Sequence, residues 1–260
     1  MNTLKISIIT VCYNSETHLE EAIQSVINQS YENKEYIIID GGSTDRTLSI
    51  IETDRNKIDY FVSEPDKGIS DAFNKGIMAA TGDVIGIINS DDKLEKDALQ
   101  IVAESYEDSV DLYRGILKMW DDETGYVYNQ YPTMDWPKLP FKMAVAHPST
   151  FVTKRAYNQY GNYDVGLKYS MDLDLLLRFE RNQVVKKYID YPLAFFRLGG
   201  VSQSNESKRQ KEICMVLANN GSSTFHIFCF RIYYIFRLTM KHLINNLFGK
   251  EFKSYFSKRI

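Results

Sequence analysis

The sequence predicts an α/β fold: a doubly wound, mostly parallel sheet with helices on both faces, followed by an amphipathic helical tail. Through about the first ninety residues, runs of β-branched residues alternate with helix-forming segments, which is typical of consecutive βαβ units. Each run ends in Gly, Asn, Asp or Ser, residue types that favour turns and helix caps. The tail differs in charge, because residues 224–260 hold seven Lys or Arg and one Glu, a formal +6 that leaves −9 on the rest.

The first half of the chain is predicted to hold four strands. They are expected at residues 6–13, 35–40, 58–63 and 83–88, where apolar side chains run almost without interruption. Helices are expected between them, from the turn at 14–17 to about residue 30, at 46–53 and at 69–80. Gly41 and Gly42 supply a tight turn after the second strand, and Gly82 stops the third helix. Right-handed crossovers would place the loops that follow these strands along one edge of the sheet.

The second half is less regular. Strands are expected at 111–118 and 125–131 around a turn at 121–123, and residues 132–140, rich in Pro and Trp, are predicted to form an ordered loop. A short helix is expected near 154–160, another helix begins at Met171, and residues 195–202 close the globular part. The length of 260 residues suits one large domain with a small appendage, which we place at 1–203 and 204–260.

Composition limits the class of protein. The chain is 44% hydrophobic and 25% charged, as in ordinary globular domains. The three cysteines, Cys12, Cys214 and Cys229, match neither a metal-ligand pattern nor a disulfide framework, so we expect a reducing, cytoplasmic environment. Residues 6–13 are too short and too polar for a signal peptide, and no uncharged stretch is long enough to span a bilayer.

Polar and acidic residues gather where the predicted strands end. Asp40, Asp66, Asn89, Asp91 and Asp92 each follow a strand, so one crevice at the carboxyl edge of the sheet can collect them. Adjacent carboxylates repel unless a positive charge lies between them, which favours a hard divalent cation that carries a phosphorylated substrate. The alternative is a solvated turn that also caps the next helix. No G-x-G-x-x-G follows the first strand and no P-loop motif occurs, which argues against a dinucleotide-binding dehydrogenase and a P-loop enzyme.

Taken together, an ordered set of segments resembles the family 2 glycosyltransferases, which have the nucleotide-sugar-binding GT-A fold, and most of all the bacterial members that build cell-surface polysaccharides. The set includes Asp-Gly-Gly-Ser-Thr-Asp at 40–45 and Asn-Ser-Asp-Asp at 89–92. The matching segments are 7–14, 39–45, 63–68, 71–76, 81–92, 147–149, 161–164, the region of Asp172, and 199–202. The resemblance covers about residues 4–203, with a nucleotide-sugar half at about 1–92 and an acceptor half at about 93–203.

On the donor side, the resemblance implies a nucleoside-diphosphate sugar, with uridine diphosphate favoured. It puts Asp40 on the pyrimidine edge and Val11 and Tyr13 in the wall of that pocket, with Asp66 also on the nucleotide sugar. It makes Asp91 and Asp92 the ligands of a Mn²⁺ or Mg²⁺ ion that neutralises the leaving diphosphate, with Asn89 beside them. Relatives often have Asp at the position of Asn89. Asp40 could instead only cap the following helix.

On the acceptor side, the resemblance implies inversion in a single displacement, with Asp172 as general base. Asp174 is the second choice for this role. The alternative for Asp172 is an acid that only stabilises a helix N-terminus. His147 is either an acceptor or phosphate contact or a buried structural histidine, and Arg197 pairs either with diphosphate or with a surface acid.

The tail suggests where the acceptor lies. Residues 224–260 combine aromatic and basic side chains, which suits a helix on an anionic membrane surface. A saccharide acceptor linked to polyprenyl diphosphate, on the inner face of the cell membrane, would share that surface. The alternative is a pair of helices packed on the catalytic domain or on a second subunit. We expect no nucleic-acid partner.

Two other functional classes remain open at this point. One is a nucleotide-sugar enzyme of another type, such as a nucleotidyltransferase, although the loop at 12–15 lacks the Gly- and Arg-rich character of that class. The other is a catalytically silent, membrane-attached scaffold, against which the acids at 40, 91, 92 and 172 argue.

Overall fold

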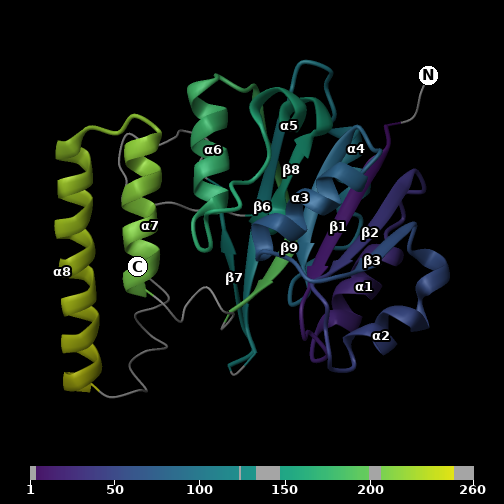
Figure 1. The fold of residues 1–260 in the computed structure, drawn as a ribbon, viewed down its shortest axis with the longest axis horizontal. Helices are drawn as coiled ribbons and strands as arrows, with labels where there is room; N and C mark the ends of the chain where they lie inside the picture. Colours follow the sequence, from purple (N-terminus) through teal and green to yellow (C-terminus); the bar gives the residue numbers. More distant parts are fainter. Residues whose placement is uncertain (1–3, 123, 133–146, 199–205, 249–260) are drawn as a thin grey trace.

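The fold was analysed in a computed structural model that describes residues 4–122, 124–132, 147–198 and 206–248. Its centre is a nine-stranded sheet in the order β3-β2-β1-β4-β8-β6-β9-β5, with β7 paired to β6 (Figure 1). The first four strands are mutually parallel: β1 (Ile6–Cys12), β2 (Lys34–Asp40), β3 (Tyr60–Ser63) and β4 (Val84–Asn89). This half confirms the predicted βαβ succession, with strand ends within two residues of those expected.

The other half of the sheet mixes directions. It contains β5 (Lys93–Leu94), β6 (Leu112–Asp121), β7 (Tyr126–Gln130), β8 (Thr150–Thr153) and β9 (Lys186–Arg197). β8 runs antiparallel to both β4 and β6, whereas β6 and β9 are parallel. β8 therefore joins the parallel first half to the second half of the sheet.

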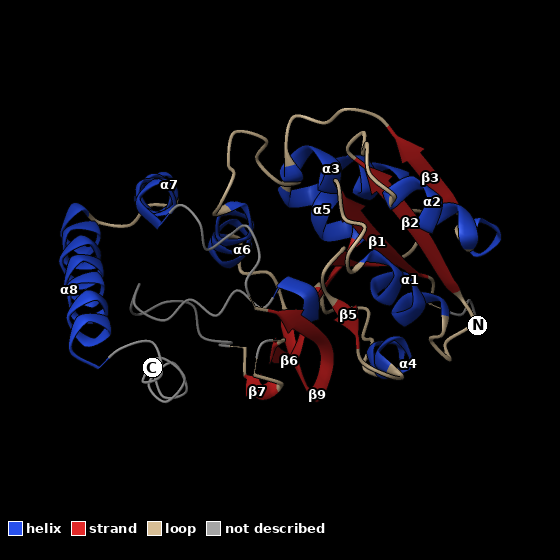
Figure 2. Cartoon of the chain, turned by 90° about the horizontal axis from the view of Figure 1, so that it is seen from below, coloured by secondary structure: helices blue, strands red, loops and turns tan. Residues whose placement is uncertain are grey.

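Helices cover both faces of the sheet. They are α1 (Leu19–Ile27), α2 (Thr47–Thr53), α3 (Ile69–Ala79), α4 (Ala98–Glu104), α5 (Lys154–Tyr160) and α6 (Met171–Arg181). Side chains alternate along β1, so that Ile9 packs with α3, α5 and α6 while Ile8 packs with α1, α2 and α4. Figure 2 shows α3 and α5 on one side of the sheet and α1 and α4 on the other. The two cores confirm a doubly wound arrangement.

Two further helices follow the sheet. α7 (Glu206–Asn219) packs beside α6, and α8 (Thr224–Phe248) packs beside α7, so that the three helices form a row in both views (Figures 1 and 2). Phe230 and Tyr234 of α8 are buried in the same core as α6. Among the described helices, none is both long and apolar enough to cross a bilayer.

β9 is the main element that the sequence did not predict. It begins with two lysines and contains Pro192, which cannot donate a ladder hydrogen bond. The structure accommodates this proline at an irregularity in the pairing with β6, where the register shifts around Ile116. Of the predicted segment 195–202, residues 195–197 are the end of β9 and residues 199–202 lie outside the described ranges, as does most of the predicted loop at 132–140.

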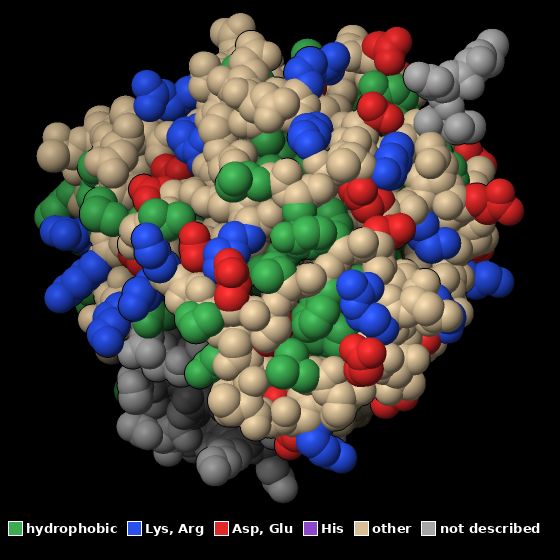
Figure 3. Space-filling view, turned by 45° about the vertical axis from the view of Figure 1, so that its right-hand side comes forward, with side chains coloured by type: hydrophobic (Ala, Val, Ile, Leu, Met, Phe, Trp, Pro, Cys, Tyr) green, Lys and Arg blue, Asp and Glu red, His purple; other side chains and the backbone are tan. Residues whose placement is uncertain are grey.

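The face of the molecule drawn in Figure 3 carries mixed charges. Lys, Arg, Asp and Glu side chains are interspersed around a central group of apolar side chains. Neither positive nor negative side chains dominate this face, whereas the sequence of residues 224–260 is rich in Lys and Arg.

Candidate active site

The predicted polar residues of the first half meet at the carboxyl edge of the sheet. In the register of the strands, Cys12 is beside Asp40, Val11 is beside Asn89, and Asp40 is beside Ser63. The loops after β1, β2, β3 and β4 therefore leave the sheet side by side. This arrangement follows from the parallel topology, because parallel strands end together.

The Asp40 carboxylate is directed into the protein. Its side chain is fully buried and accepts hydrogen bonds from the backbone N–H groups of Gly42 (3.1 Å) and Ser43 (2.9 Å). It also accepts from the hydroxyl groups of Ser63 (2.6 Å) and Ser43. The helix that follows is held instead by Asp45, whose Oδ1 accepts from the N–H of Thr47 (3.0 Å). In this structure Asp40 thus fixes the turn at 41–43.

Asp66 and Tyr13 lie at the surface of the same corner. A Cβ atom at Gly41 would lie 2.5 Å from Oδ2 of Asp66 and 3.4 Å from the ring of Tyr13. The missing side chain at Gly41 is therefore what lets the Asp66 carboxylate approach this turn. The N–H of Gly68 holds the other oxygen of Asp66 (2.8 Å), and the Tyr13 ring is 63% exposed.

The loop at 89–92 contains one carboxylate turned inward. Asp92 is 2% exposed, its Oδ1 accepts from the backbone N–H of Arg197 (3.2 Å), and its Oδ2 accepts from the amide of Asn89 (3.0 Å). Burial and the neighbouring charge of Asp91 raise the pKa of Asp92 well above its ordinary value. Each oxygen of Asp92 thus already accepts one hydrogen bond from the protein, and Asp91 is the more exposed of the two acids that were expected to hold a metal.

Asp91 and Asn89 provide the remaining oxygens of the loop. Asp91 is partly exposed, and burial raises the pKa of its carboxyl group. Oδ1 of Asn89 is buried and has no hydrogen-bond partner among the described residues. An orphaned amide oxygen next to a partly desolvated carboxylate fits a hard cation. The described residues contain no group of three or more His, Cys, Asp or Glu side chains that could hold a metal, so substrate phosphate and water would have to complete the coordination.

Arg197 ties this loop to the rest of the domain. Its guanidinium donates to the Asp91 carbonyl (3.2 Å), pairs with Glu21 (3.1 Å) and with Asp122, and stacks over Trp120 at 4.3 Å. With 8% exposure, the side chain is held by acids rather than free for diphosphate. The sequence could not distinguish between diphosphate and an acid as the partner of Arg197, because Glu21 and Asp122 are far from Arg197 along the chain.

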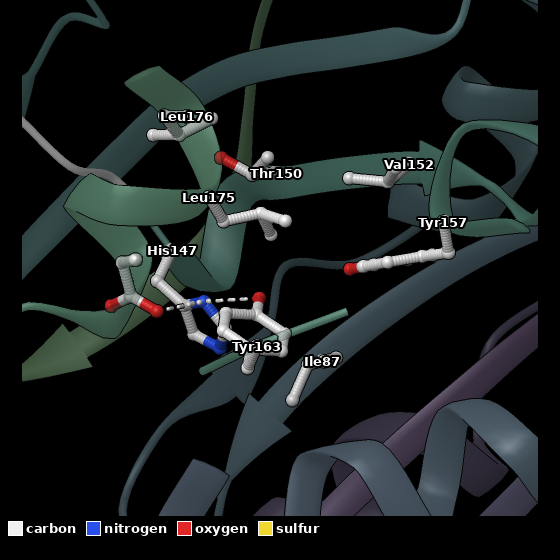
Figure 4. Close-up of a pocket in the computed structure, with 9 residues that line it drawn as sticks. Ile87, His147, Thr150, Val152, Tyr157, Tyr163, Leu175 and Leu176 are labelled. Atoms are coloured by element: carbon white, nitrogen blue, oxygen red, sulfur yellow. Dashed lines mark hydrogen bonds and ion pairs between the residues drawn. The ribbon is translucent and has the colours of Figure 1, made fainter. Parts of the chain in front are cut away.

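Asp172 opens the second half of the site. It occupies the second position of α6, and its side chain is 28% exposed. Its Oδ1 lies 3.3 Å from Nδ1 of His147, and the Tyr163 hydroxyl lies 3.5 Å from the same nitrogen (Figure 4). The His147 ring stacks on Phe73, with centroids 5.0 Å apart and planes at 20°. Nε2 of His147 is buried without a hydrogen-bond partner among the described residues.

A small cavity adjoins this cluster. Its volume of about 20 Å³ is enough for one water molecule. It is lined by Ile87, His147, Thr150, Val152, Tyr157, Tyr163, Asp172, Leu175 and Leu176. In Figure 4 the Tyr157 hydroxyl points toward the cavity from the side opposite His147. Burial raises the pKa of Tyr163 well above its ordinary value, and neighbouring Tyr157 and Asp172 add to this, so the phenol stays protonated. Because Ile87 belongs to β4, the acidic loop and the Asp172 cluster share one strand.

Asp174 has a different environment from Asp172. It is 9% exposed and accepts hydrogen bonds from Nε of Arg178 (2.8 Å) and from the amide of Asn220 (3.0 Å). Arg178 also donates to the carbonyl of Tyr160 (2.6 Å). Asp174 thus anchors α6 to its neighbours, and of these two acids Asp172 is the one that reaches solvent.

Comparisons with known proteins agree with this geometry. The family model described as "Glycosyl transferase family 2" matches residues 7–161. An uncharacterized glycosyltransferase of Haemophilus influenzae is 42% identical over 103 residues, 38% of this chain and 41% of that protein. The Escherichia coli chondroitin synthase is 29% identical over 187 residues, 66% of this chain and 26% of that protein. The chain therefore spans less than half the length of either relative.

Solved structures share the fold. S. aureus TarS in complex with UDP aligns with a TM-score of 0.64 and 20% identity, over 99% of this chain and 75% of that chain. The Pyrobaculum calidifontis mannosyltransferase PcManGT, in complex with GDP-Man and Mn²⁺, aligns with a TM-score of 0.61 and 15% identity, over 84% of this chain and 64% of that chain. At these identities the likeness concerns the fold alone.

Proposed function

Because the chain belongs to family 2 of the glycosyltransferases and has their GT-A fold, we propose that it transfers a sugar from a nucleoside-diphosphate sugar to a saccharide acceptor, with inversion at the anomeric carbon. One observation carries the proposal. A partly exposed carboxylate, Asp172, lies beside His147 in the half of the site that β4 joins to the acidic loop at 89–92. A single displacement requires a base and a diphosphate site near each other, and β4 connects the two groups of residues proposed for these roles.

The residues divide the reaction between them. The acceptor oxygen attacks the anomeric carbon as the bond to the diphosphate breaks, and Asp172 takes the proton of the acceptor hydroxyl. The charge that develops on the diphosphate must be neutralised at the other end of the crevice. A divalent cation supplies this neutralisation when bound, and Asp91 and Oδ1 of Asn89 are the groups that would hold it.

Asp66 and Tyr13 form the proposed nucleotide pocket, with Val11 behind them and Asp40 holding the turn. A carboxylate accepts hydrogen bonds, so it pairs with the N3–H of uracil and rejects a base that presents a lone pair there. This favours a uridine over a cytidine diphosphate donor, and the UDP in the TarS complex supports the choice of uridine. A thermal-shift screen of nucleotide sugars with and without Mn²⁺ or Mg²⁺ tests the choice of nucleotide and the need for a metal, because a ligand of the native state raises the melting temperature.

The test of the reaction itself is Asp172→Asn. This variant keeps the size of the side chain and removes the base, so kcat should fall by about 10²- to 10⁴-fold while UDP still binds as tightly as to the wild type. Transfer rates and calorimetric UDP affinity measure the two effects. Turnover by this variant at the wild-type rate would disprove the assignment of the base.

We further propose that the acceptor is attached to polyprenyl diphosphate and that the enzyme reaches it from the cytoplasmic face of the membrane, in surface polysaccharide biosynthesis. The support is an exposed apolar stripe along α8, formed by Phe225, Phe228, Ile232, Ile235, Phe236, Met240 and Leu243. α8 contains no acidic residue, and Arg231 and Arg237 are exposed. An apolar stripe with cations and no anions suits anionic lipid.

Sedimentation with vesicles tests this placement. The double variant Ile232→Glu, Phe236→Glu should fail to pellet with anionic vesicles that carry down the wild type, while UDP binding stays unchanged. Equal pelleting of the two proteins would rule out α8 as the contact.

A further inference from the structure

The start of helix α6 lacks the cap that helices usually receive from their own sequence. Ser170 occupies the N-cap position and makes no side-chain capping bond, and its hydroxyl is buried without a hydrogen-bond partner among the described residues. The N–H groups at a helix start need acceptors from outside the helix. At this site an acceptor comes from another part of the chain.

Glu212 of α7 is that acceptor. Its Oε1 receives the backbone N–H of Tyr169 (2.6 Å) and of Ser170 (2.7 Å), and both of its oxygens lie 3.1 Å from the N–H of Lys168. Three successive N–H groups thus converge on one carboxylate just before the helix begins at Met171. A negative charge at this end also interacts favourably with the helix dipole.

From this arrangement we infer that Glu212 is a positioning residue for Asp172, an inference that depends on the proposed role of Asp172 as general base. Asp172 lies two residues after Ser170, and the Ser170 carbonyl accepts the first helical bond, from the N–H of Asp174 (3.0 Å). Met171 between them is 6% exposed and packed in the core, so this short stretch has little slack to absorb a movement at residues 168–170. Movement at 168–170 therefore changes the place of the Asp172 carboxylate relative to His147 and to the acceptor.

α7 remains attached to the domain without this carboxylate. Ile213, Cys214, Val216 and Leu217 of α7 are all buried in the core that α6 shares. Asn220, just after α7, donates to Asp174 (3.0 Å). Removing the Glu212 charge should therefore loosen the start of α6 without undocking the tail.

The experiment compares Glu212→Ala and Glu212→Gln with the control Glu180→Gln. Glu180 pairs with Lys186 near the other end of α6, so the control removes a charge from that helix while its start stays intact. Binding is measured with UDP in the presence of Mn²⁺. Turnover is measured with the UDP-sugar that raises the melting temperature of the wild type most.

We expect kcat to fall about 10- to 100-fold in Glu212→Ala, because small displacements of a catalytic group have effects of this size. Glu212→Gln keeps one carbonyl oxygen as acceptor, so its kcat should fall less than that of Glu212→Ala. UDP affinity should stay unchanged in both, amide exchange should accelerate at 168–170, and the control should behave as wild type.

Three outcomes would overturn the inference: wild-type kcat in Glu212→Ala, an equal loss of kcat in Glu180→Gln, or unchanged amide exchange at 168–170. If Glu212→Ala fails to fold, Glu212→Gln decides by the same measurements. Failure of the proposed function is distinguishable, because it would appear as full activity in Asp172→Asn, whereas amide exchange reports on Glu212 independently of turnover.

Discussion

His147 illustrates how much the site depends on single atoms. Its Nδ1 faces both Asp172 and the Tyr163 hydroxyl, while Nε2 is enclosed. The stack on Phe73 fixes the plane of the ring. The tautomer with its proton on Nδ1 would present a hydrogen-bond donor 3.3 Å from Oδ1 of Asp172, and so limit the orientations open to this carboxylate.

Two amide variants separate the two ring nitrogens. The amide of Asn can occupy the place of Nδ1, and the amide of Gln the place of Nε2. We predict that His147→Asn keeps kcat within about tenfold of wild type, whereas His147→Gln and His147→Ala lose about 10- to 100-fold. Steady-state kinetics at saturating donor measures this order. Higher activity in His147→Gln than in His147→Asn would show that Nε2 is the functional nitrogen.

At the residue scale the sequence predicts location better than orientation. The acids at 40, 66, 91 and 92 all lie at the edge where they were expected, because strand ends follow from hydrophobic runs. Which of them faces solvent depends on partners distant in sequence. Asp92 is turned inward by the N–H of Arg197, which the sequence could not indicate because β9 was not foreseen.

Among the elements, the amino-terminal ends of β1, β2 and β4 are joined by one buried acid. Glu35 of β2 is 8% exposed and accepts hydrogen bonds from the Ser7 hydroxyl (2.5 Å), the Thr81 N–H (2.7 Å) and Lys5 (3.0 Å). Burial opposes its ionisation, but these bonds prevail and lower the pKa of Glu35 from 4.5 to about 2. The ionised form is thus preferred by the folded state.

The pH dependence of stability follows from the direction in which folding shifts the pKa of Glu35. A carboxyl whose pKa is lower in the folded state stabilises the fold above its unfolded value of 4.5, and this contribution is lost as pH falls toward 2. Glu35→Gln should therefore lower the free energy of unfolding by up to about 3 kcal/mol at neutral pH, a difference that shrinks below pH 4.5. Urea unfolding at several pH values measures it, with the exposed Glu20→Gln as control. A difference independent of pH would contradict the assignment.

Elements differ in how well the sequence predicts them. Of the first four strands, β1, β2 and β4 are buried on both faces, so their uninterrupted apolar runs were sufficient to predict them. β3 lies at the edge of the sheet and is only partly buried. β5 is two residues long and carries too little pattern to recognise. β9 combines charged residues with Pro192, and only its pairing with the irregular stretch of β6 makes it a strand.

On the scale of the whole molecule, the tail forms successive layers, with α7 on α6 and α8 on α7 (Figure 1). The sequence predicted helices but could not predict which face of α8 is buried, because apolar residues surround it. Phe230 and Tyr234 face α7 and the core, whereas Phe228 and Ile232 remain exposed. The buried face of α8 serves the expected packing on protein, and the exposed face is free for the proposed contact with lipid.

The cations of α8 give a prediction at this scale. If the helix lies on anionic lipid, Arg231→Gln with Arg237→Gln should weaken vesicle binding by about tenfold or more at low salt, since each cation near the surface contributes about 1 kcal/mol. The effect should diminish at high salt, because mobile ions screen exposed charges. Sedimentation with anionic and with neutral vesicles measures both. The same loss on neutral vesicles would mean that charge is not the cause.

The order of the last three helices has a consequence for protein engineering. α7 ends at a turn in which Gly221 has a φ of +82°, and this turn separates the helix that caps α6 from the helix that carries the exposed stripe. A chimaera with a different surface-binding helix should therefore be joined at Gly221. Joining the parts before Glu206 would also replace Glu212, which accepts the N–H groups before α6, so an effect on surface binding could no longer be separated from an effect on turnover.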